Sequence, residues 1–278
     1  MIQARLSNGH IVLASDDSEF GETPIFCFDA SCGAEVIFVP STGMKSAHFK
    51  TTGKSESSRH RPCCAFYRPL SIPEMISKIA DFQNEPDILN SAKNVINLNL
   101  RSLNPEYEKK SVDRTPADNK KKNEPKIKEP NASPKSITSL KGVVNLLTMN
   151  EPDLLSSIHF NIGRGIEVPL SSVIVSQDKA HELLWSDQIL PLTGYFVHGQ
   201  IEKVWKGEKV MLLQFAEVKN TSFKVVIFEK DYCHFTYKAS QLEGRNVVAY
   251  GHLRKNEYKG NISTEMIIRS NKYLEFVK

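Results

Sequence analysis

The first seventy residues alternate between short strand-like runs and turn residues. Residues 4–6 and 10–13 flank a Ser-Asn-Gly sequence, and residues 36–39 (Val-Ile-Phe-Val) form a β-branched and aromatic run that ends at a proline. Runs of this kind, bounded by Gly, Asn or Pro, are typical of strands joined by tight turns. We therefore predict that residues 1–72 form a small β module.

The spacing of apolar residues changes between residues 73 and 103. The apolar residues that recur at helical spacing are Ile72, Met75, Ile76 and Ile79, followed by Ile88, Ala92, Val95 and Ile96. A Ser-Ile-Pro-Glu sequence at residues 71–74 is typical of a helix start. The pattern predicts one or two helices in a helical segment over residues 73–103.

Residues 104–136 contain mostly Lys, Glu, Pro, Asn and Ser and very few large apolar side chains. Such a segment cannot bury enough apolar surface to offset the entropy lost on ordering, so we expect a disordered linker.

Residues 137–191 contain both helix-like and strand-like patterns. They predict helices at 140–147 and 177–185 and strands at 158–162 and 172–175, which together form an α/β extension.

Residues 192–278 are almost entirely strand-like. The expected strands are 195–204, 210–218, 223–228, 245–254 and 262–268, with an irregular or helical insert at 232–242 and a last short run at 273–277. Five strands with an insert between the third and the fourth is the plan of an OB-fold. The predicted fold class is thus α+β, mainly β with some helix: an N-terminal zinc-bound β module, a helical segment, a disordered linker and a C-terminal OB-like β-barrel.

The composition limits the partners and the cellular compartment that we expect for the chain. The formal net charge is +4, so nucleic acid is a permissible partner but not a required one. The chain starts without the apolar stretch of a signal peptide and has no apolar run near the roughly 18 residues needed to span a bilayer. We expect a cytoplasmic protein without a membrane partner. In that reducing setting, clustered cysteines bind metal more often than they form disulfides.

Most of the potential metal ligands lie in one short stretch. They are Cys27, Cys32, His48, His60, Cys63 and Cys64. Structural zinc takes four tetrahedral sulfur or nitrogen ligands. Cys27 and Cys32, followed by a glycine, resemble a first pair of knuckle ligands, and His60 with Cys63 has the spacing of a second pair.

Adjacent cysteines rarely bind the same ion, so one of Cys63 and Cys64 is expected to be a spectator, and we favour Cys63 as the ligand. The predicted cofactor is one structural zinc, with its ligands among Cys27, Cys32, His48, His60 and Cys63. The alternative is a set of free thiols with incidental histidines. A disulfide is not expected in the absence of an export signal.

These residues resemble the N-terminal domain of CoiA-like competence proteins and related phage and mobile-element proteins. The resemblance rests on a strand pair over residues 4–12, on Phe26-Cys27 and Cys32-Gly33 with Val36, and on His48-Phe49. It covers about the first seventy residues and implies a zinc-stabilised β module in a protein that handles DNA. The wider first knuckle and the paired Cys63-Cys64 depart from the family pattern and leave the ligand set open.

An enzymatic role has little support in the residues. A nuclease of the restriction-enzyme type needs acidic Mg²⁺ ligands and an Asp/Glu-x-Lys sequence. The nearest match is Asp153 or Glu167 followed by Gln177-Asp178-Lys179, which also fits the plain start of a helix. No P-loop occurs. We expect a protein that is not an enzyme, with a divergent metal-dependent nuclease as an alternative.

OB-folds bind single strands by combining aromatic platforms with a basic groove. The candidate nucleic-acid-binding residues are Lys203, Trp205, Lys206, Lys209, Lys224, Arg254, Tyr258 and Lys259. Tyr195 and Phe223 are expected in the core. The resulting hypothesis is binding of nucleic acid, single-stranded DNA in particular, in recombination, replication, uptake or phage and mobile-element biology. The second hypothesis is an adaptor that binds a protein partner.

Overall fold

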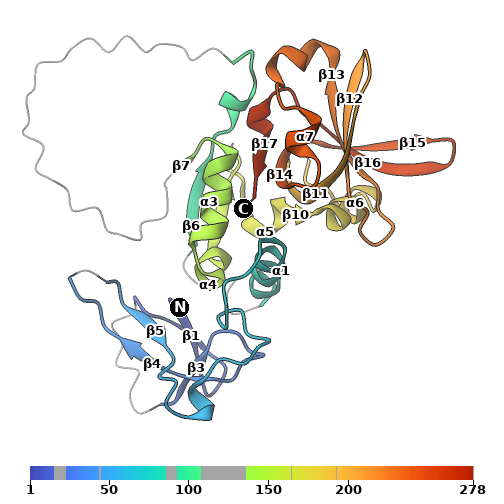
Figure 1. Ribbon diagram of the computed structural model, residues 1–278. Helices are drawn as coiled ribbons and strands as arrows, with labels where there is room; N and C mark the ends of the chain where they lie inside the picture. The colour runs from blue at the N-terminus through green and yellow to red at the C-terminus, as the bar shows by residue number, and fades with distance from the viewer. Residues whose placement is uncertain are drawn as a thin grey trace, which may run out of the picture.

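The computed structural model describes residues 1–15, 23–43, 45–85, 93–107, 136–163, 165–191 and 193–277. Three β-sheets and several helices make up this part of the chain (Figure 1). The prediction of an α+β chain, mainly β with some helix, is therefore confirmed. None of the described helices is long and apolar enough to cross a membrane.

The first sheet contains five antiparallel strands in the order β2-β1-β3-β4-β5. Its elements are β1 (Gln3–Leu6), β2 (Ile11–Leu13), β3 (Ile25–Cys27), β4 (Glu35–Val39), β5 (His48–Lys50) and the 3-10 helix η1 (Glu56–Ser58). Gly9, with φ of +86°, lies in the turn between the first two strands. The left-handed backbone explains why glycine stands there.

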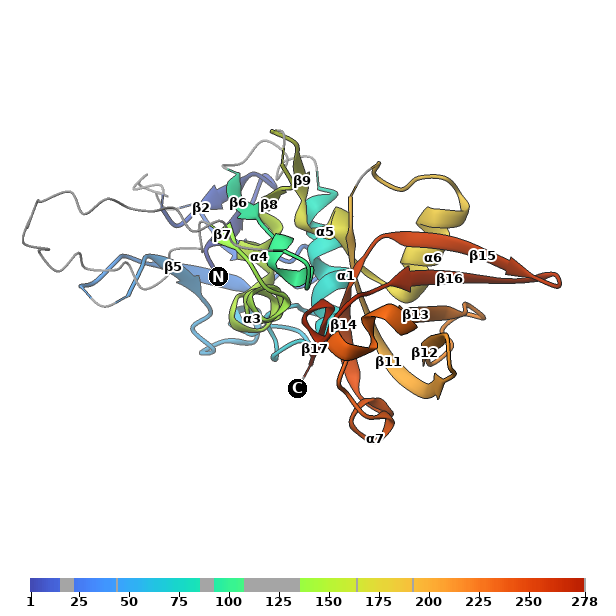
Figure 2. The same ribbon diagram turned by 90° about the horizontal axis from the view of Figure 1, so that it is seen from above.

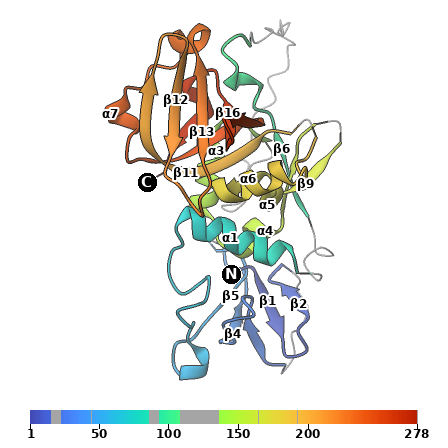
Figure 3. The ribbon, with the colours of Figure 1, turned by 90° about the vertical axis from the view of Figure 1, so that its right-hand side faces the viewer.

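Helix α1 (Ile72–Gln83) connects the first sheet to the rest of the molecule (Figure 3). It begins as predicted, with the side chain of Glu74 accepting a hydrogen bond from Ser71 N at 2.9 Å, and its four expected apolar residues are buried. The second predicted helix is wrong at Val95 and Ile96, which lie in strand β6 (Asn94–Leu98). Hydrogen bonding to strands on both sides overrides the helical spacing there. Ile88 and Ala92 lie outside the described residues.

The second sheet has the order β7-β6-β8-β9. Its further elements are η2 (Arg101–Leu103), β7 (Ser136–Ile137), α3 (Leu140–Met149), α4 (Pro152–Ser156), β8 (Ile158–Asn161), β9 (Glu167–Pro169) and α5 (Leu170–Val173). Two ends of the predicted linker are ordered: Ser136 pairs with β6, and Tyr107 N donates a hydrogen bond to Asn104 O. Residues 108–135 of that prediction lie outside the described part of the chain.

The third sheet runs β15-β16-β13-β12-β11-β14-β17, and β10 also pairs with β11. Its elements are β10 (Ile174–Ser176), α6 (Gln177–Trp185), β11 (Tyr195–Lys206), β12 (Val210–Phe215), β13 (Phe223–Phe228), η3 (Glu229–His234), α7 (Ala239–Leu242), β14 (Asn246–Gly251), β15 (Leu253–Tyr258), β16 (Asn261–Ile267), η4 (Asn271–Tyr273) and β17 (Leu274–Phe276). The strand expected at 172–175 begins only at Ile174, because the preceding residues complete α5.

The strand order of this sheet is the order expected for an OB-fold, but its hydrogen bonds do not close a barrel. β14 pairs with β11 and β15 pairs with β16, whereas β14 and β15 follow each other along the chain with only His252 between them. The expected fourth strand is thus longer than predicted and split in two. The edge strand β15 is therefore joined to β14 by the chain itself instead of by a further ladder of hydrogen bonds.

The hairpin of β15 and β16 projects from the sheet as an arm (Figure 2). Arg254 and Tyr258 both lie in β15, which extends past the strand end expected at residue 254. The turn consists of Lys259 and Gly260, with φ of +51° and +78°. Two consecutive residues with positive φ form the tight hairpin turn that suits the twist of the strands, so the arm extends further than the sequence indicated.

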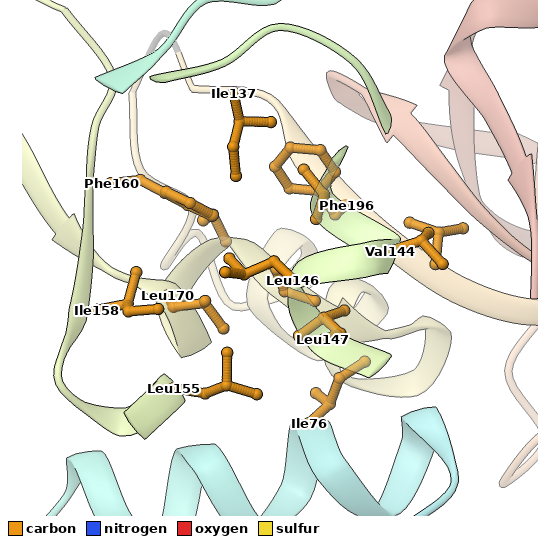
Figure 4. Close-up of a cluster of buried hydrophobic side chains, with 14 of the residues drawn as sticks. Ile76, Ile137, Val144, Leu146, Leu147, Leu155, Ile158, Phe160, Leu170 and Phe196 are labelled. Atoms are coloured by element: carbon orange, nitrogen blue, oxygen red, sulfur yellow. The ribbon is translucent and has the colours of Figure 1, made fainter. Parts of the chain in front are cut away.

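One apolar core joins the second sheet to the third. Figure 4 shows Ile76 of α1, Leu146 and Leu147 of α3, Phe160 of β8 and Phe196 of β11 around the same space. Phe160 and Phe196 are fully buried, with ring centroids 6.3 Å apart. The described residues between 72 and 277 therefore pack as a continuous unit, to which the first sheet is attached.

Candidate functional sites

Four of the six candidate ligands gather at the end of β3, the middle strand of the first sheet. The ligand atoms of Cys27, Cys32, His60 and Cys64 all lie within 4.8 Å of one another. The Sγ atoms of Cys27 and Cys64 are 3.6 Å apart, and His60 Nδ1 lies 3.5 Å from Cys32 Sγ and 3.4 Å from Cys64 Sγ. All three cysteines are buried. Cys27 ends β3, and the other three ligands lie in turns beside it.

The size of the cluster can be compared with that of a metal site. Tetrahedral zinc with ordinary bond lengths separates two sulfurs by roughly 3.8 Å and a sulfur and a nitrogen by roughly 3.6 Å. The three distances above agree with these edges to within a few tenths of an ångström. With three thiols and one imidazole, the cluster has the geometry and the chemistry to bind a metal ion.

The choice between the adjacent cysteines differs from our expectation. Cys64 lies in the cluster, whereas Cys63 is exposed and its Sγ lies 3.6 Å from Ser31 O. The turn in which Cys64 N donates to Arg61 O directs the second cysteine inward. The adjacency of Cys63 and Cys64 indicates that only one of them binds the ion, but it does not show which one. His48 also lies outside the cluster, and its Nδ1 is 2.9 Å from Ser46 O.

The protein environment shifts the pKa values of the three buried thiols in different directions. A hydrogen bond from Cys27 holds the pKa of Cys64 at about 6, and the same interaction, together with burial, raises the pKa of Cys27. Burial raises the pKa of Cys32, although backbone N–H groups of Arg61 and Ala34 act in the opposite direction. Metal binding requires deprotonated thiols, so a metal ion would displace protons from this pocket.

Asp29 positions the turns that carry the ligands, and no sequence pattern pointed to it. Its carboxylate is buried and accepts hydrogen bonds from Ser31 Oγ at 2.6 Å and Ala65 N at 2.8 Å. It also pairs with Lys78 of α1 at 3.2 Å. Burial alone would raise the pKa of Asp29, but these hydrogen bonds hold it below its usual value. Asp29 thus connects both ligand turns to the helix.

A second site is formed by the outer face of the third sheet. The strand register places five residues in one row across five strands: Lys203, Gln214, Lys224, Glu265 and Arg254. Neighbours across a sheet point to the same face. The alternate residues of β12, such as Leu213 and Phe215, are fully buried, so the row lies on the outside.

Two aromatic residues flank this row on the same face. Trp205 lies two residues after Lys203 in β11, and Tyr258 lies four residues after Arg254 in β15. Their exposed fractions are 52% and 66%. The indole of Trp205 lies over the next turn, since a Cβ on Gly207 would come within 2.4 Å of its ring. Tyr195 and Phe223, which were expected in the core, are buried, so that prediction is confirmed.

The remaining predicted residues are distributed differently. Lys209 lies in the β11–β12 turn and Lys259 in the β15–β16 turn, where its Nζ is 5.3 Å from the centre of the Tyr258 ring. Lys206 pairs with the buried Met211 and lies 5.0 Å from the ring of Tyr232, so it is not on the outer face. Which lysines lie on the outer face is decided by the register between strands, and a single sequence does not show that register.

The same register reveals polar residues that sequence reasoning missed. Glu265 is nearly buried and accepts hydrogen bonds from Arg254 Nη2 at 3.0 Å and Asn256 Nδ2 at 2.7 Å. This carboxylate neutralises one arginine of the face and fixes its position. The net positive charge of the row therefore comes from Lys203 and Lys224.

The residues considered for a nuclease do not form a metal site. In the described part of the chain, Asp153, Glu167 and Asp178 belong to no group of metal ligands. Asp153 is buried and accepts hydrogen bonds from the backbone of Ile2 and Gln3. Asp178 pairs with Lys219 at 2.7 Å. These carboxylates therefore connect parts of the fold.

Comparisons with known proteins add little to this description. No protein-family model and no curated protein matches the chain. Among solved structures it is similar to the crystal structure of the S. pombe Stn1-Ten1 complex, with 19% identity and a TM-score of 0.26 over 32% of this chain and 61% of that one. It is also similar to the Entamoeba histolytica asparaginyl-tRNA synthetase in complex with asparaginyl-adenylate, with 13% identity and a TM-score of 0.26 over 38% of this chain and 23% of that one. The chain thus covers less than two thirds of both structures, and likenesses with TM-scores this low carry no argument about fold or function.

Proposed function

We propose that this chain binds nucleic acid, single-stranded DNA in particular, on the outer face of its third sheet. The observation that carries the proposal is the polar row across five strands, in which Lys203 and Lys224 supply the net positive charge, with Trp205 and Tyr258 on either side. Single strands are bound by this combination, because bases stack on aromatic rings while lysines and arginines follow the phosphates.

The position of the two aromatics supports this role. Trp205 adjoins the turn between the first two strands of the OB-like order, and Tyr258 adjoins the turn before its last strand. These turns correspond to the loops that frame the oligonucleotide-binding face of an OB-fold. An exposed Trp and an exposed Tyr on one face also lose solvent contact on binding, which favours a ligand with flat apolar surfaces.

We also propose that Cys27, Cys32, His60 and Cys64 hold one structural zinc ion. The four ligands leave no position for a substrate, and three of them are buried. A closed site of this kind supplies a cross-link between turns instead of a reaction. The proposed protein is thus a binding protein and not an enzyme.

The binding proposal is tested with a labelled oligo-dT at low salt. Stacking contributes about 1–3 kcal/mol per base, so Trp205→Ala combined with Tyr258→Ala should weaken binding by at least about 30-fold. A control variant, Tyr107→Ala combined with Met149→Ala, removes two exposed apolar side chains elsewhere and should bind normally. If the folded unchanged protein does not shift the oligonucleotide, or if the aromatic variant binds as well as the control, the proposal is wrong.

A further inference from the structure

Residues 45–68, which include β5 and η1 and carry two of the candidate metal ligands, have a local excess of positive charge; we call this segment the basic loop. Residues 45–68 contain six Lys or Arg, one Glu and no Asp, whereas the whole chain has 36 basic and 32 acidic residues. The basic residues of this basic loop are Lys45, Lys50, Lys54, Arg59, Arg61 and Arg68, and all six are exposed. The excess is therefore local and faces solvent.

The ligands determine the path of this loop. Arg59 and Arg61 flank His60, and Arg61 O accepts a hydrogen bond from Cys64 N at 2.9 Å. Arg59 Nε donates to Gly53 O at 3.2 Å, which connects the ligand turn to the preceding turn that carries Lys54. The side chains of Arg59 and Arg61 thus extend from the same stretch of backbone as the candidate ligands His60 and Cys64.

The preceding turn is ordered by its own hydrogen bonds. Ser58 is buried, and its hydroxyl accepts from Thr52 Oγ1 at 3.0 Å and from Ser55 N at 3.1 Å. Gly53 N donates to Ser58 O at 3.2 Å. A rigid turn presents Lys54 at a defined position, which lowers the entropy lost when a ligand is bound.

The charge of the loop is largely uncompensated. Among the described ion pairs, only the one between Arg68 and Glu74 involves a basic residue of this loop. The loop also carries an exposed aromatic, Tyr67, whose N–H donates to Cys64 O at 3.1 Å and whose exposed fraction is 54%. Basic side chains beside an exposed aromatic ring are the features that also characterise the outer face of the third sheet.

We infer that the basic loop is a second contact surface for nucleic acid, which it binds through the phosphates. The inference rests on the proposed function, because it assumes that nucleic acid is the ligand of this chain. Phosphate contacts by Lys and Arg add affinity without adding sequence specificity. A metal ion in the cluster would serve this contact by holding the loop, so that loss of the metal and loss of the basic residues should have similar effects on binding.

The test uses the triple variant Lys54→Gln, Arg59→Gln and Arg61→Gln in the full chain. Its matched control is Lys93→Gln, Lys141→Gln and Lys272→Gln, which removes the same charge from exposed positions elsewhere. Binding of a long oligo-dT is measured across a range of salt concentrations. Each lost phosphate contact lowers the salt slope by about 0.7 for single strands, so the triple variant should lose about 2 from its slope and roughly tenfold or more in affinity.

The outcomes separate this inference from the proposed function. If the triple variant matches its control in affinity and slope, the inference is wrong even where the variant of Trp205 and Tyr258 fails to bind. If the aromatic variant binds normally and the triple variant does not, the basic loop is confirmed and the face of the third sheet is not. An equal loss of binding to poly-glutamate would assign the loop to acidic polypeptides and overturn the nucleic-acid assignment.

The metal content and melting temperature of the triple variant are compared with those of the unchanged protein. If the variant loses its metal, Lys45→Gln, Lys50→Gln and Lys54→Gln replace it, because these residues lie outside the turn that carries His60 and Cys64. The same loss in slope and affinity is expected. Binding equal to that of the control by this variant would also overturn the inference.

Discussion

The first and third sheets obtain their stability from different sources. Apart from Val36 and Phe49, the buried cluster of the first sheet consists of alanines and candidate-ligand cysteines; its members are Ala4, Ala14, Cys27, Cys32, Ala34, Val36, Phe49 and Cys64. The cluster inside the third sheet contains Phe, Ile, Val, Leu, Met and Tyr side chains from most of its strands. Apolar burial stabilises in proportion to area, so the first sheet gains much less from it than the third.

The smaller apolar core of the first sheet gives a physical reason for the candidate metal ligands to lie there and not in the third sheet. A β module of about seventy residues whose core is mostly alanines and cysteines gains little from apolar burial, and small domains of this kind commonly add a metal or a disulfide. Contacts with α1 supply part of the stabilisation that this small core does not. Phe28 and Phe82 pack edge to face with ring centroids 4.7 Å apart, and Lys78 pairs with Asp29.

The largest expected effect is the loss of a metal ligand. Cys64→Ser should abolish metal binding and unfold the first sheet, because structural zinc contributes on the order of 10 kcal/mol to small zinc domains. Metal per chain and the protease sensitivity of residues 1–70 are the measurements. Both tryptophans, Trp185 and Trp205, lie in the C-terminal part, so their fluorescence should remain native.

Cys63→Ser is the matched control, since it changes the neighbouring thiol, which lies outside the cluster. It should keep one metal ion per chain and a native first sheet. Equal metal loss in both variants, or metal retained by Cys64→Ser, would contradict the proposed ligand set and the contrast between the two sheets.

A smaller effect is expected from a core substitution in the third sheet. Phe215 is fully buried and packs on Phe223 with ring centroids 5.1 Å apart. Phe215→Ala should lower the free energy of unfolding of this region by about 3–5 kcal/mol. Urea unfolding followed by tryptophan fluorescence measures the change. Metal content should be unaltered, and a loss of metal in this variant would show that the two regions depend on each other.

The smallest effect concerns the ion pair between α6 and the β12–β13 loop. Burial would raise the pKa of Asp178, but hydrogen bonds from Lys219 and Ser176 outweigh it and hold the pKa below its usual value. A depressed carboxyl pKa stabilises the fold above the usual value and loses this contribution as the pH falls through the lower folded pKa. Lys219 is exposed and Asp178 is only partly buried, so solvent screens the pair and the contribution is small.

Comparison of the unchanged protein with Asp178→Asn tests this sign. The difference between their urea midpoints should favour the unchanged protein at pH 7 and shrink as the pH falls below about 4. A difference that persists unchanged in acid would mean that the carboxylate acts through its shape or its hydrogen bonds to neutral groups instead of its charge.

Local patterns predicted many of the elements. The helical spacing of Ile72, Met75, Ile76 and Ile79, with the capping pair Ser71 and Glu74, identified α1 and its buried side. Alternating residues identified the core of β12, as at Leu213 and Phe215. Val95 and Ile96 were assigned to a helix because a short apolar run does not reveal that its backbone has strands on both sides.

The sequence by itself determined which residues can bind metal and which strands follow one another, because ligand chemistry and local periodicity are properties of residue type and spacing. Only the tertiary structure decided that Cys64 joins the cluster and Cys63 does not, because that choice depends on the direction of a turn. Only the register between strands decided that Lys203, Lys224 and Arg254 lie in one row and that Lys206 lies elsewhere. Hydrogen bonds between distant strands set that register, and no local pattern contains it.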